Sequence, residues 1–232
     1  MIGRASLSEC LRLVSIYQLT WNLNYFLNIY LNYWVAPEKA IVFDAYGASF
    51  LYLFSGAFGL AYTCLLPQKV AVDHPRNEMN RVSLIFGMIG TGFIVCTFIF
   101  ASAHYITYSV ENNNLAGMNI MFAISASIIG TFIGSALFGS GKVGYKEVLT
   151  GSVSGAVMIS SIAPIFDNIG FMIMFGLIAG LISGIYMQTL HKVINKNYIY
   201  DSLGLFGPFF LNAFIGSFVV APSLLDRFLL YK

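Results

Sequence analysis

Few side chains in this sequence could transfer a proton or bind a metal ion. The three histidines stand far apart, at His74, His104 and His191. His74 lies in the polar stretch Asp73–Glu78, with no second histidine or cysteine at the spacing of a metal site, so a solvated loop explains it better. His104 and His191 end apolar stretches, where an imidazole suits the membrane interface. We predict no metal site and no catalytic histidine.

The acidic residues give no sign of catalysis either. Asp44, Asp167 and Asp201 lie at the ends of apolar stretches, and these stretches contain no paired carboxylates of the kind found in proton pumps. Asp44 and Asp201 suit the N-terminal caps of helices, where a carboxylate accepts hydrogen bonds from free backbone N–H groups. The three cysteines have no close pair, which indicates small buried residues. We predict that the chain is not an enzyme and holds no cofactor. Bound phospholipid is compatible with this prediction.

The elements that carry these residues are apolar and long. The chain is 58% hydrophobic and 9% charged, whereas an average soluble domain has roughly 25% charged residues. Seven stretches almost free of charge are each long enough for a transmembrane helix of about 20 residues. We place helices at about 11–35, 45–66, 83–105, 117–139, 147–165, 169–190 and 203–222. The sequence predicts an all-α, polytopic membrane helix bundle that forms one integral membrane domain, 1–232.

The basic residues gather on one side of this predicted bundle. If the first helix starts inside, that side holds Arg4, Arg12, Lys69, Arg76, Arg81, Lys142, Lys146, Lys192 and Lys196. The other side holds Lys39, Arg227 and Lys232. Such a bias places the N-terminus on the cytoplasmic or matrix side of the membrane. The net charge of +2 is too small to indicate nucleic-acid binding.

Small residues recur at helical spacing in two of the predicted helices. Gly176, Gly180 and Gly184 stand four apart, and Gly130 and Gly134 repeat the spacing. Glycines on one face allow the backbones of two membrane helices to approach closely. We expect these five residues to form helix-packing contacts rather than a solute pathway.

Two further features concern the first and last helices. The first carries amide side chains on one broad face, and since amides facing lipid are costly, that face should meet other helices. These amides are Gln18, Asn22, Asn24, Asn28 and Asn32. In the last helix, Pro208 stands beside Gly204 and Gly207 and removes a backbone hydrogen bond, so we expect a kink or a break there.

Several segments together resemble the ammonium transporter and Rhesus protein family. Residues 44–60 read Asp-Ala-Tyr-Gly-Ala-Ser, later Gly-Ala-Phe-Gly-Leu, and are similar to a family helix with Asp-Ala-Gly-Gly-Ser, three residues, then a histidine. Further similar segments lie at 87–91, 135–143, 150–157, 176–183 and 201–204. Aligned in this way, the seven predicted helices resemble the fourth to the tenth of the eleven in that fold. This agrees with the orientation given by the charges.

The resemblance also implies a departure from the family's chemistry. Family members conduct ammonia through a narrow apolar pore, in which two histidines on pseudo-symmetric helices hydrogen-bond to each other. In this sequence the first position is Tyr52, and the second, counted from Asp201, is Phe209. A phenol has a pKa near 10 and a phenyl ring carries no proton, so neither replaces an imidazole as a relay near neutral pH. The family's first three helices, which supply part of the pore wall, have no counterpart in the alignment.

These points lead to a functional expectation with stated alternatives. We expect a transport-inactive, Rhesus-like pseudo-transporter that is a structural accessory subunit of a larger membrane complex, in a hetero-oligomer with other membrane subunits and lipids. A respiratory-chain complex of the mitochondrial inner membrane is the favoured assembly. One alternative is a channel for ammonia or another small neutral solute, as a homotrimer in the plasma membrane. Another is a split transporter whose remaining helices come from a second polypeptide.

Overall fold

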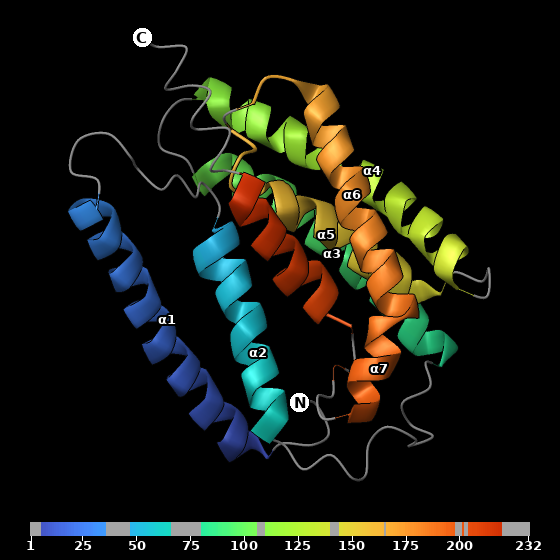
Figure 1. Ribbon diagram of the computed structural model, residues 1–232, viewed down its shortest axis with the longest axis horizontal. Helices are drawn as coiled ribbons and strands as arrows, with labels where there is room; N and C mark the ends of the chain where they lie inside the picture. Colours follow the sequence, from blue (N-terminus) through green and yellow to red (C-terminus); the bar gives the residue numbers. More distant parts are fainter. Residues whose placement is uncertain are drawn as a thin grey trace. The chain divides into compact units, whose positions relative to one another are not determined.

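The computed structural model describes residues 6–35, 47–65, 80–105, 110–139, 144–164, 166–197, 201 and 204–219 (Figure 1). Every regular element in this part of the chain is a helix, as predicted. The elements fall into two compact units, α1 in one and the elements from Gly47 onward in the other. The predicted fold class, an all-α polytopic membrane bundle, is confirmed.

The first unit contains the helix α1, Leu7–Val35. Its N-terminus is capped reciprocally, since the Ser6 N–H donates to the Glu9 carboxylate at 2.7 Å and the Glu9 N–H donates to Ser6 Oγ at 3.3 Å. The bond from Ser6 holds the pKa of the Glu9 carboxyl below its usual value. Gln18 and Asn22, two of the predicted amides, are exposed within this unit.

The second unit contains the remaining helices. Two of its segments are π-helical: η1, Ala48–Leu53, which leads directly into α2, Phe54–Leu65, and η3, Phe206–Leu211, which continues as a helix to Val219. Between them lie α3, Arg81–Tyr105; α4, Val110–Phe138; α5, Tyr145–Ile159; α6, Ile169–Gln188; and α7, Leu190–Asn197. Relative to the helices expected from the sequence, α4 begins earlier, α5 ends earlier and α7 is a separate helix.

Three of the described helices are long and apolar enough to cross a bilayer. They are the segments Arg81–Phe100, Asn114–Phe138 and Ile169–Gln188, while Leu51–Cys64 and Phe206–Val219 are apolar but shorter. The charge gaps in the sequence predicted about seven spans. The three spans are counted within the described residues alone, and Leu51–Cys64 and Phe206–Val219 both lie at the edges of described ranges. Two other helices are less apolar, because α1 carries its amides and α5 has 15 residues rich in hydroxyl groups.

The helices α4 and α6 approach each other backbone to backbone. The predicted packing glycines all lie in this interface, where a Cβ atom added to any of them would collide with the main chain of the other helix. Gly176 faces Ala123, Gly180 faces Ser127, Gly184 faces Thr131, Gly130 faces Leu177 and Gly134 faces Leu181. In lipid the hydrophobic effect does not drive helices together, and close van der Waals contact between backbones stabilises their association instead.

Hydroxyl groups add hydrogen bonds where these backbones meet. Ser127 Oγ of α4 donates to the carbonyl oxygen of Gly151 in α5 at 2.5 Å, and Thr131 Oγ1 donates to the carbonyl oxygen of Gly180 at 3.1 Å. Both side chains are buried. Because glycine exposes its carbonyl to a neighbouring helix, the same residues allow close packing and accept these bonds.

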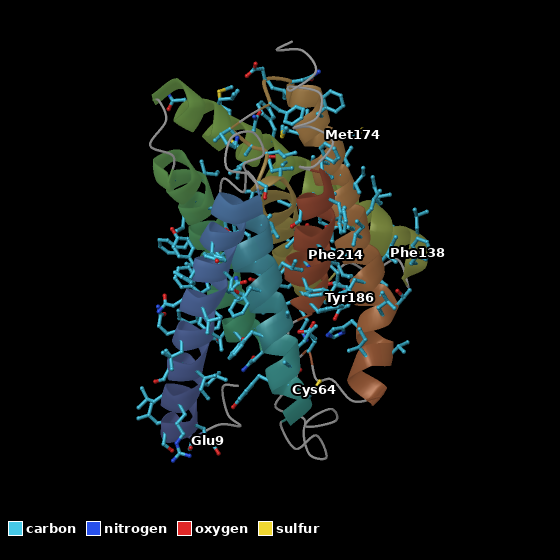
Figure 2. All side chains as sticks on the ribbon, turned by 60° about the vertical axis from the view of Figure 1, so that its left-hand side comes forward. Glu9, Cys64, Phe138, Met174, Tyr186 and Phe214 are labelled. Atoms are coloured by element: carbon cyan, nitrogen blue, oxygen red, sulfur yellow. The ribbon has the colours of Figure 1, made fainter. Side chains whose placement is uncertain are left out.

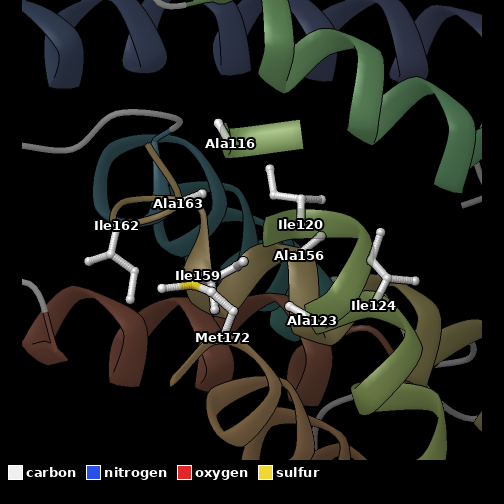
Figure 3. Packing of buried hydrophobic residues seen from close by; sticks show 9 residues of the cluster. All are labelled: Ala116, Ile120, Ala123, Ile124, Ala156, Ile159, Ile162, Ala163 and Met172. Carbon is white, nitrogen blue, oxygen red and sulfur yellow. The ribbon is translucent and has the colours of Figure 1, made fainter. Parts of the chain in front are cut away.

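An apolar cluster closes one end of the α4–α5–α6 interface (Figure 3). Its buried members are Ala116, Ile120, Ala123, Ile124, Ala156, Ile159, Ile162, Ala163 and Met172. Beside it, Asn119 is fully buried and its Nδ2 donates to the carbonyl oxygens of Ala163 and Phe166, each at 2.8 Å. These two carbonyl groups lie beyond the end of α5, where no helical N–H group is available to them, so the Asn119 side chain supplies the missing donor.

The glycine interface leads to a first prediction. The variant Gly180→Ala should lower the free energy of unfolding by about 1–3 kcal/mol, because its Cβ meets the Ser127 backbone, which cannot move aside cheaply. Gly90→Ala in α3 is the matched control, since nothing lies within 4 Å of its Cβ position, and the higher helix propensity of alanine should leave stability equal or slightly higher. Thermal unfolding in detergent measures both. Equal stability of the two variants would contradict the packing.

Candidate functional site

A sequence pattern occurs twice, on the two π-helical segments of the second unit. Asp44, Gly47 and Tyr52 have the same spacing as Asp201, Gly204 and Phe209. Gly47 has φ 77° and Gly204 has φ 69°, and the positive φ values in the described part of the chain occur at these two glycines. Since L side chains rarely adopt this conformation, glycine is required just before each segment. Asp44 lies outside the described residues.

Local geometry explains why both segments are wound more widely than an α-helix. In η1 the Tyr52 N–H donates to the Gly47 carbonyl oxygen at 2.9 Å, across five residues. In η3, Pro208 stands in the first turn. Backbone N–H groups in a first turn have no partner within the helix, so a proline there costs no helical hydrogen bond. The last helix therefore begins at Phe206, so Pro208 does not interrupt a continuous helix. Single π-helical turns are frequent at functional sites.

The two π-helical segments place their aromatic rings in contact. The ring centroids of Tyr52 and Phe209 are 6.2 Å apart with 43° between the planes, and Tyr52 stacks on Phe98 of α3 at 5.6 Å and 26°. We call Tyr52, Phe98 and Phe209 the ring cluster. It packs against three buried residues of α5 and of the last helix, namely Val153, Val157 and Ala213.

The repeated helices also cross each other closely beside the ring cluster. A Cβ on Gly56, twelve residues after Asp44, would come within 2.9 Å of the Phe210 Cβ. Ala213 takes the equivalent position after Asp201, and Leu53 packs against the cluster that contains Ala213. Small residues at equivalent positions of both repeats thus bring the two ring-bearing helices together.

Asp201 joins the start of the second repeat to α6. Its Oδ1 accepts a hydrogen bond from the Leu205 N–H at 2.9 Å, and its Oδ2 accepts one from the Phe206 N–H at 2.9 Å. The same Oδ2 accepts from the hydroxyl of Tyr186 at 2.8 Å, and His191 Nε2 donates to the Asp201 carbonyl oxygen at 2.6 Å. Tyr186, near the end of α6 (Figure 2), is 1% exposed. Asp201 therefore caps η3 and ties it to α6 and α7 at once.

Comparison with known proteins identifies the scaffold. The model of the Ammonium Transporter Family matches residues 4–227, which is nearly the whole chain. This chain belongs to the ammonium transporter family.

Two curated relatives and one solved structure are similar to this member of the ammonium transporter family. Rhesus-like glycoprotein B of Dictyostelium discoideum is 29% identical over 196 residues, covering 83% of this chain and 32% of the relative. Ammonium transporter Rh type C of Xenopus laevis is 25% identical over 196 residues, covering 83% of this chain and 41% of the relative. The structure of Nitrosomonas europaea Rh50 superimposes with a TM-score of 0.75 at 23% identity, covering 86% of this chain and 52% of that one. The chain thus spans a third to a half of the length of these proteins.

The structure brings together some of the predicted site residues. Tyr52 and Phe209, where the resemblance places the two family histidines, are in direct contact. Of the histidines, His191 bonds to Asp201, while His74 and the side chain of His104 lie outside the described residues. Within the described part of this family member, no group of three His, Cys, Asp or Glu residues could hold a metal ion.

Two residues of this site were not predicted from the sequence. Phe98, which stacks on Tyr52, is one of many phenylalanines in the apolar stretch of α3 and has no distinguishing neighbour. Tyr186 is different, because it follows the glycine repeat of α6 and two residues beyond it the apolar stretch ends. A tyrosine at that boundary carries a hydroxyl that must find a partner when buried, and this is a usable signal.

The link between Tyr186 and Asp201 leads to a second prediction. Tyr186→Phe and Asp201→Ala should each lower the free energy of unfolding by about 1–3 kcal/mol, because each leaves a buried or half-buried polar partner without its bond. The double variant should lose clearly less than the sum of the two, since both changes remove the same bond. Chemical or thermal unfolding of the four proteins measures this coupling.

The control is Tyr145→Phe, which removes a separate bond between the hydroxyl groups of Tyr145 and Thr91, 2.6 Å apart. The Tyr145 hydroxyl contacts Thr91 of α3, whereas Asp201 bonds to Tyr186, His191, Leu205 and Phe206, so the effect of Tyr145→Phe should add to that of Asp201→Ala. If Tyr186→Phe were also additive with Asp201→Ala, the bond between them would not stabilise the fold.

Proposed function

We propose that this chain is a transport-inactive member of the ammonium transporter family that acts as a structural accessory subunit of a larger membrane complex. The observation that supports this most strongly is the ring cluster. The positions where the resemblance puts a histidine pair hold Tyr52 and Phe209, whose centroids are 6.2 Å apart.

The chemistry of these rings opposes a relay of protons. A proton relay near neutral pH needs groups that gain and lose a proton there, as imidazole does. Phe209 and Phe98 have no such group, and a tyrosine hydroxyl has an ordinary pKa near 10. Tyr52 of η1 also contacts both Phe98 of α3 and Phe209 of η3, so side chains occupy the space between the repeats. The site therefore supports packing in place of ammonium conduction.

The accessory role is supported by what the helices expose. Large apolar side chains on α3 and α4 are exposed within the chain, and α1 carries amides that lipid satisfies poorly. Lipid suits the apolar side chains, whereas partner helices would supply hydrogen bonds to the amides, which favours a hetero-oligomer with other membrane subunits and with lipid. We place this assembly in the mitochondrial inner membrane, in a respiratory-chain complex, because such complexes gather subunits that have no chemistry of their own.

A second candidate function is conduction of a small neutral solute such as ammonia. The observation that favours it is the likeness to Nitrosomonas europaea Rh50, described as showing the mechanism of conduction by the Rhesus family of channels, at a TM-score of 0.75. A neutral solute does not need a proton relay, so the loss of histidines alone would not exclude it. This candidate would suit a homotrimer in the plasma membrane.

A flux measurement separates the two candidates and is our third prediction. Liposomes carrying the purified chain should take up ammonia at the rate of protein-free liposomes, followed by an internal pH dye after an ammonium jump. A conducting Rhesus protein at the same density is the positive control. Flux above the protein-free rate that Tyr52→Trp abolishes would favour the channel. The matched control is Phe214→Trp, since Phe214 is exposed on the face of the last helix (Figure 2) and should not alter flux.

The accessory role gives a fourth prediction. Purification of the tagged chain from native membranes in mild detergent should recover it with other membrane subunits, identified by mass spectrometry, at a mass far above that of the 25.5 kDa chain. The reason is that lipid satisfies its exposed amide groups poorly, so they need protein partners. Recovery as a free monomer, or as a homotrimer, would contradict the proposal. Organelle fractionation of the same preparation tests the mitochondrial assignment separately.

A further inference from the structure

The short helix α7 has two chemically different sides. Its sequence, Leu190–Asn197, includes apolar and basic residues. The helical period places Leu190, Val193 and Ile194 on one side and Lys192 and Lys196, one turn apart, on the other. A basic amphipathic helix is typical of segments that lie at a membrane surface.

The position of α7 in the fold agrees with that pattern. It follows the membrane-spanning segment Ile169–Gln188 after a single residue, Thr189, at which α6 ends (Figure 1). Gln188 Nε2 donates to Glu147 Oε1 at 3.1 Å, which brings the end of α6 to the first turn of α5. A Cβ on Gly139 would contact the Gln188 side chain, so α4 ends there too. Since α4 and α6 both span the bilayer, α7 begins where they leave its apolar interior.

The apolar side of α7 is open in the chain. Leu190 is 46% exposed and Val193 is 54% exposed, although both are large aliphatic side chains. The helix is nevertheless held in place, because the His191 ring donates to the Asp201 carbonyl oxygen at 2.6 Å and α7 packs against the end of α6. An open apolar side on an anchored helix at the bilayer boundary needs an occupant.

We propose that α7 binds the anionic phospholipid surface of the membrane leaflet at this end of the bundle. Leu190, Val193 and Ile194 insert at the boundary between headgroups and acyl chains, and Lys192 and Lys196 contact headgroup phosphates and carboxylates. Charge complementarity favours an anionic lipid surface over a neutral partner helix. A neutral helix would contact only the apolar side, whereas an anionic surface also attracts the two lysines that stand one turn apart.

Two acidic residues of the described part of the chain at this end accept hydrogen bonds from other groups. Glu147 accepts the hydrogen bond from Gln188, and Asp201 accepts bonds from Leu205, Phe206 and Tyr186. Both carboxylates are thus directed into the fold by other donors. Each lysine close to an anionic surface strengthens binding by about fivefold. The inference holds whether or not the chain conducts a solute, because it uses no residue of the ring cluster.

Hydrogen exchange of the full-length chain in nanodiscs tests this proposal. Backbone amides of Leu190–Asn197 should exchange at least about fivefold more slowly in discs with 30% phosphatidylserine than in discs of phosphatidylcholine alone. Lys192→Gln combined with Lys196→Gln should remove this difference, while the arginine pair at the same positions should keep it. Amides of α4 near Gly130 serve as the internal control and should be unaffected in every sample.

The outcomes separate the alternatives. Equal exchange in both lipid compositions, or a glutamine pair that responds like the wild type, would overturn the proposal. Protection that is already complete in phosphatidylcholine and unchanged by the glutamine pair would indicate a protein contact and also overturn it. Inorganic phosphate added to phosphatidylcholine discs should not protect the helix, and protection by it would show binding of a free anion in place of a lipid surface.

Discussion

The absence of side chains between α4 and α6 is the constraint on which the rest of the structure depends. Five glycines bring the two backbones so close that an added Cβ would meet main-chain atoms. At this separation Thr131 reaches the Gly180 carbonyl oxygen and Ser127 reaches that of Gly151, which positions α5 against both helices. α5 in turn supplies Val153 and Val157, the surface on which the ring cluster packs. The site is therefore placed by residues that take no part in it.

The second level of organisation is the repeat that carries the rings. Each copy has a glycine with positive φ, a π-helical turn and an aromatic residue five positions after the glycine. The wide turn changes the direction in which the ring leaves its helix, and the small residues Gly56 and Ala213 let the two copies cross. Because both copies use the same geometry, their rings meet each other at the crossing. The contact between Tyr52 and Phe209 follows from backbone features rather than from an affinity between these two side chains.

Some of this could be predicted from the sequence, and the reasons differ from residue to residue. Glycines four apart have one common use in membrane helices, so the interface of α4 and α6 was accessible from spacing alone. The pairing of Tyr52 with Phe209 came from the family resemblance and could not have come from periodicity, since 157 positions separate the two residues. The π-helical turns, Phe98 and the brief α7 were not predicted, because each depends on which helices are neighbours. The criterion of long uncharged stretches does not separate apolar segments from segments rich in amide or hydroxyl groups, such as α1 and α5.

The same hierarchy explains how a family scaffold can be kept while its site changes. The determinants of the fold are glycines, hydroxyls and the cap at Asp201, and none of these needs a histidine at the crossing of the repeats. A histidine pair there would place two polar rings among Val153, Val157 and Ala213, where an unmet hydrogen bond costs about 1–3 kcal/mol. Phe98 and Phe209 have no such requirement, and the contact of Tyr52 with each of them adds about 0.5–1.5 kcal/mol beyond the burial of its surface. In the function proposed above, rings without a group that titrates near neutral pH would take the place of imidazoles, and their contacts would stabilise the helix crossing. A scaffold in which the site is this independent of the fold is well suited to a role that depends on its outer surfaces.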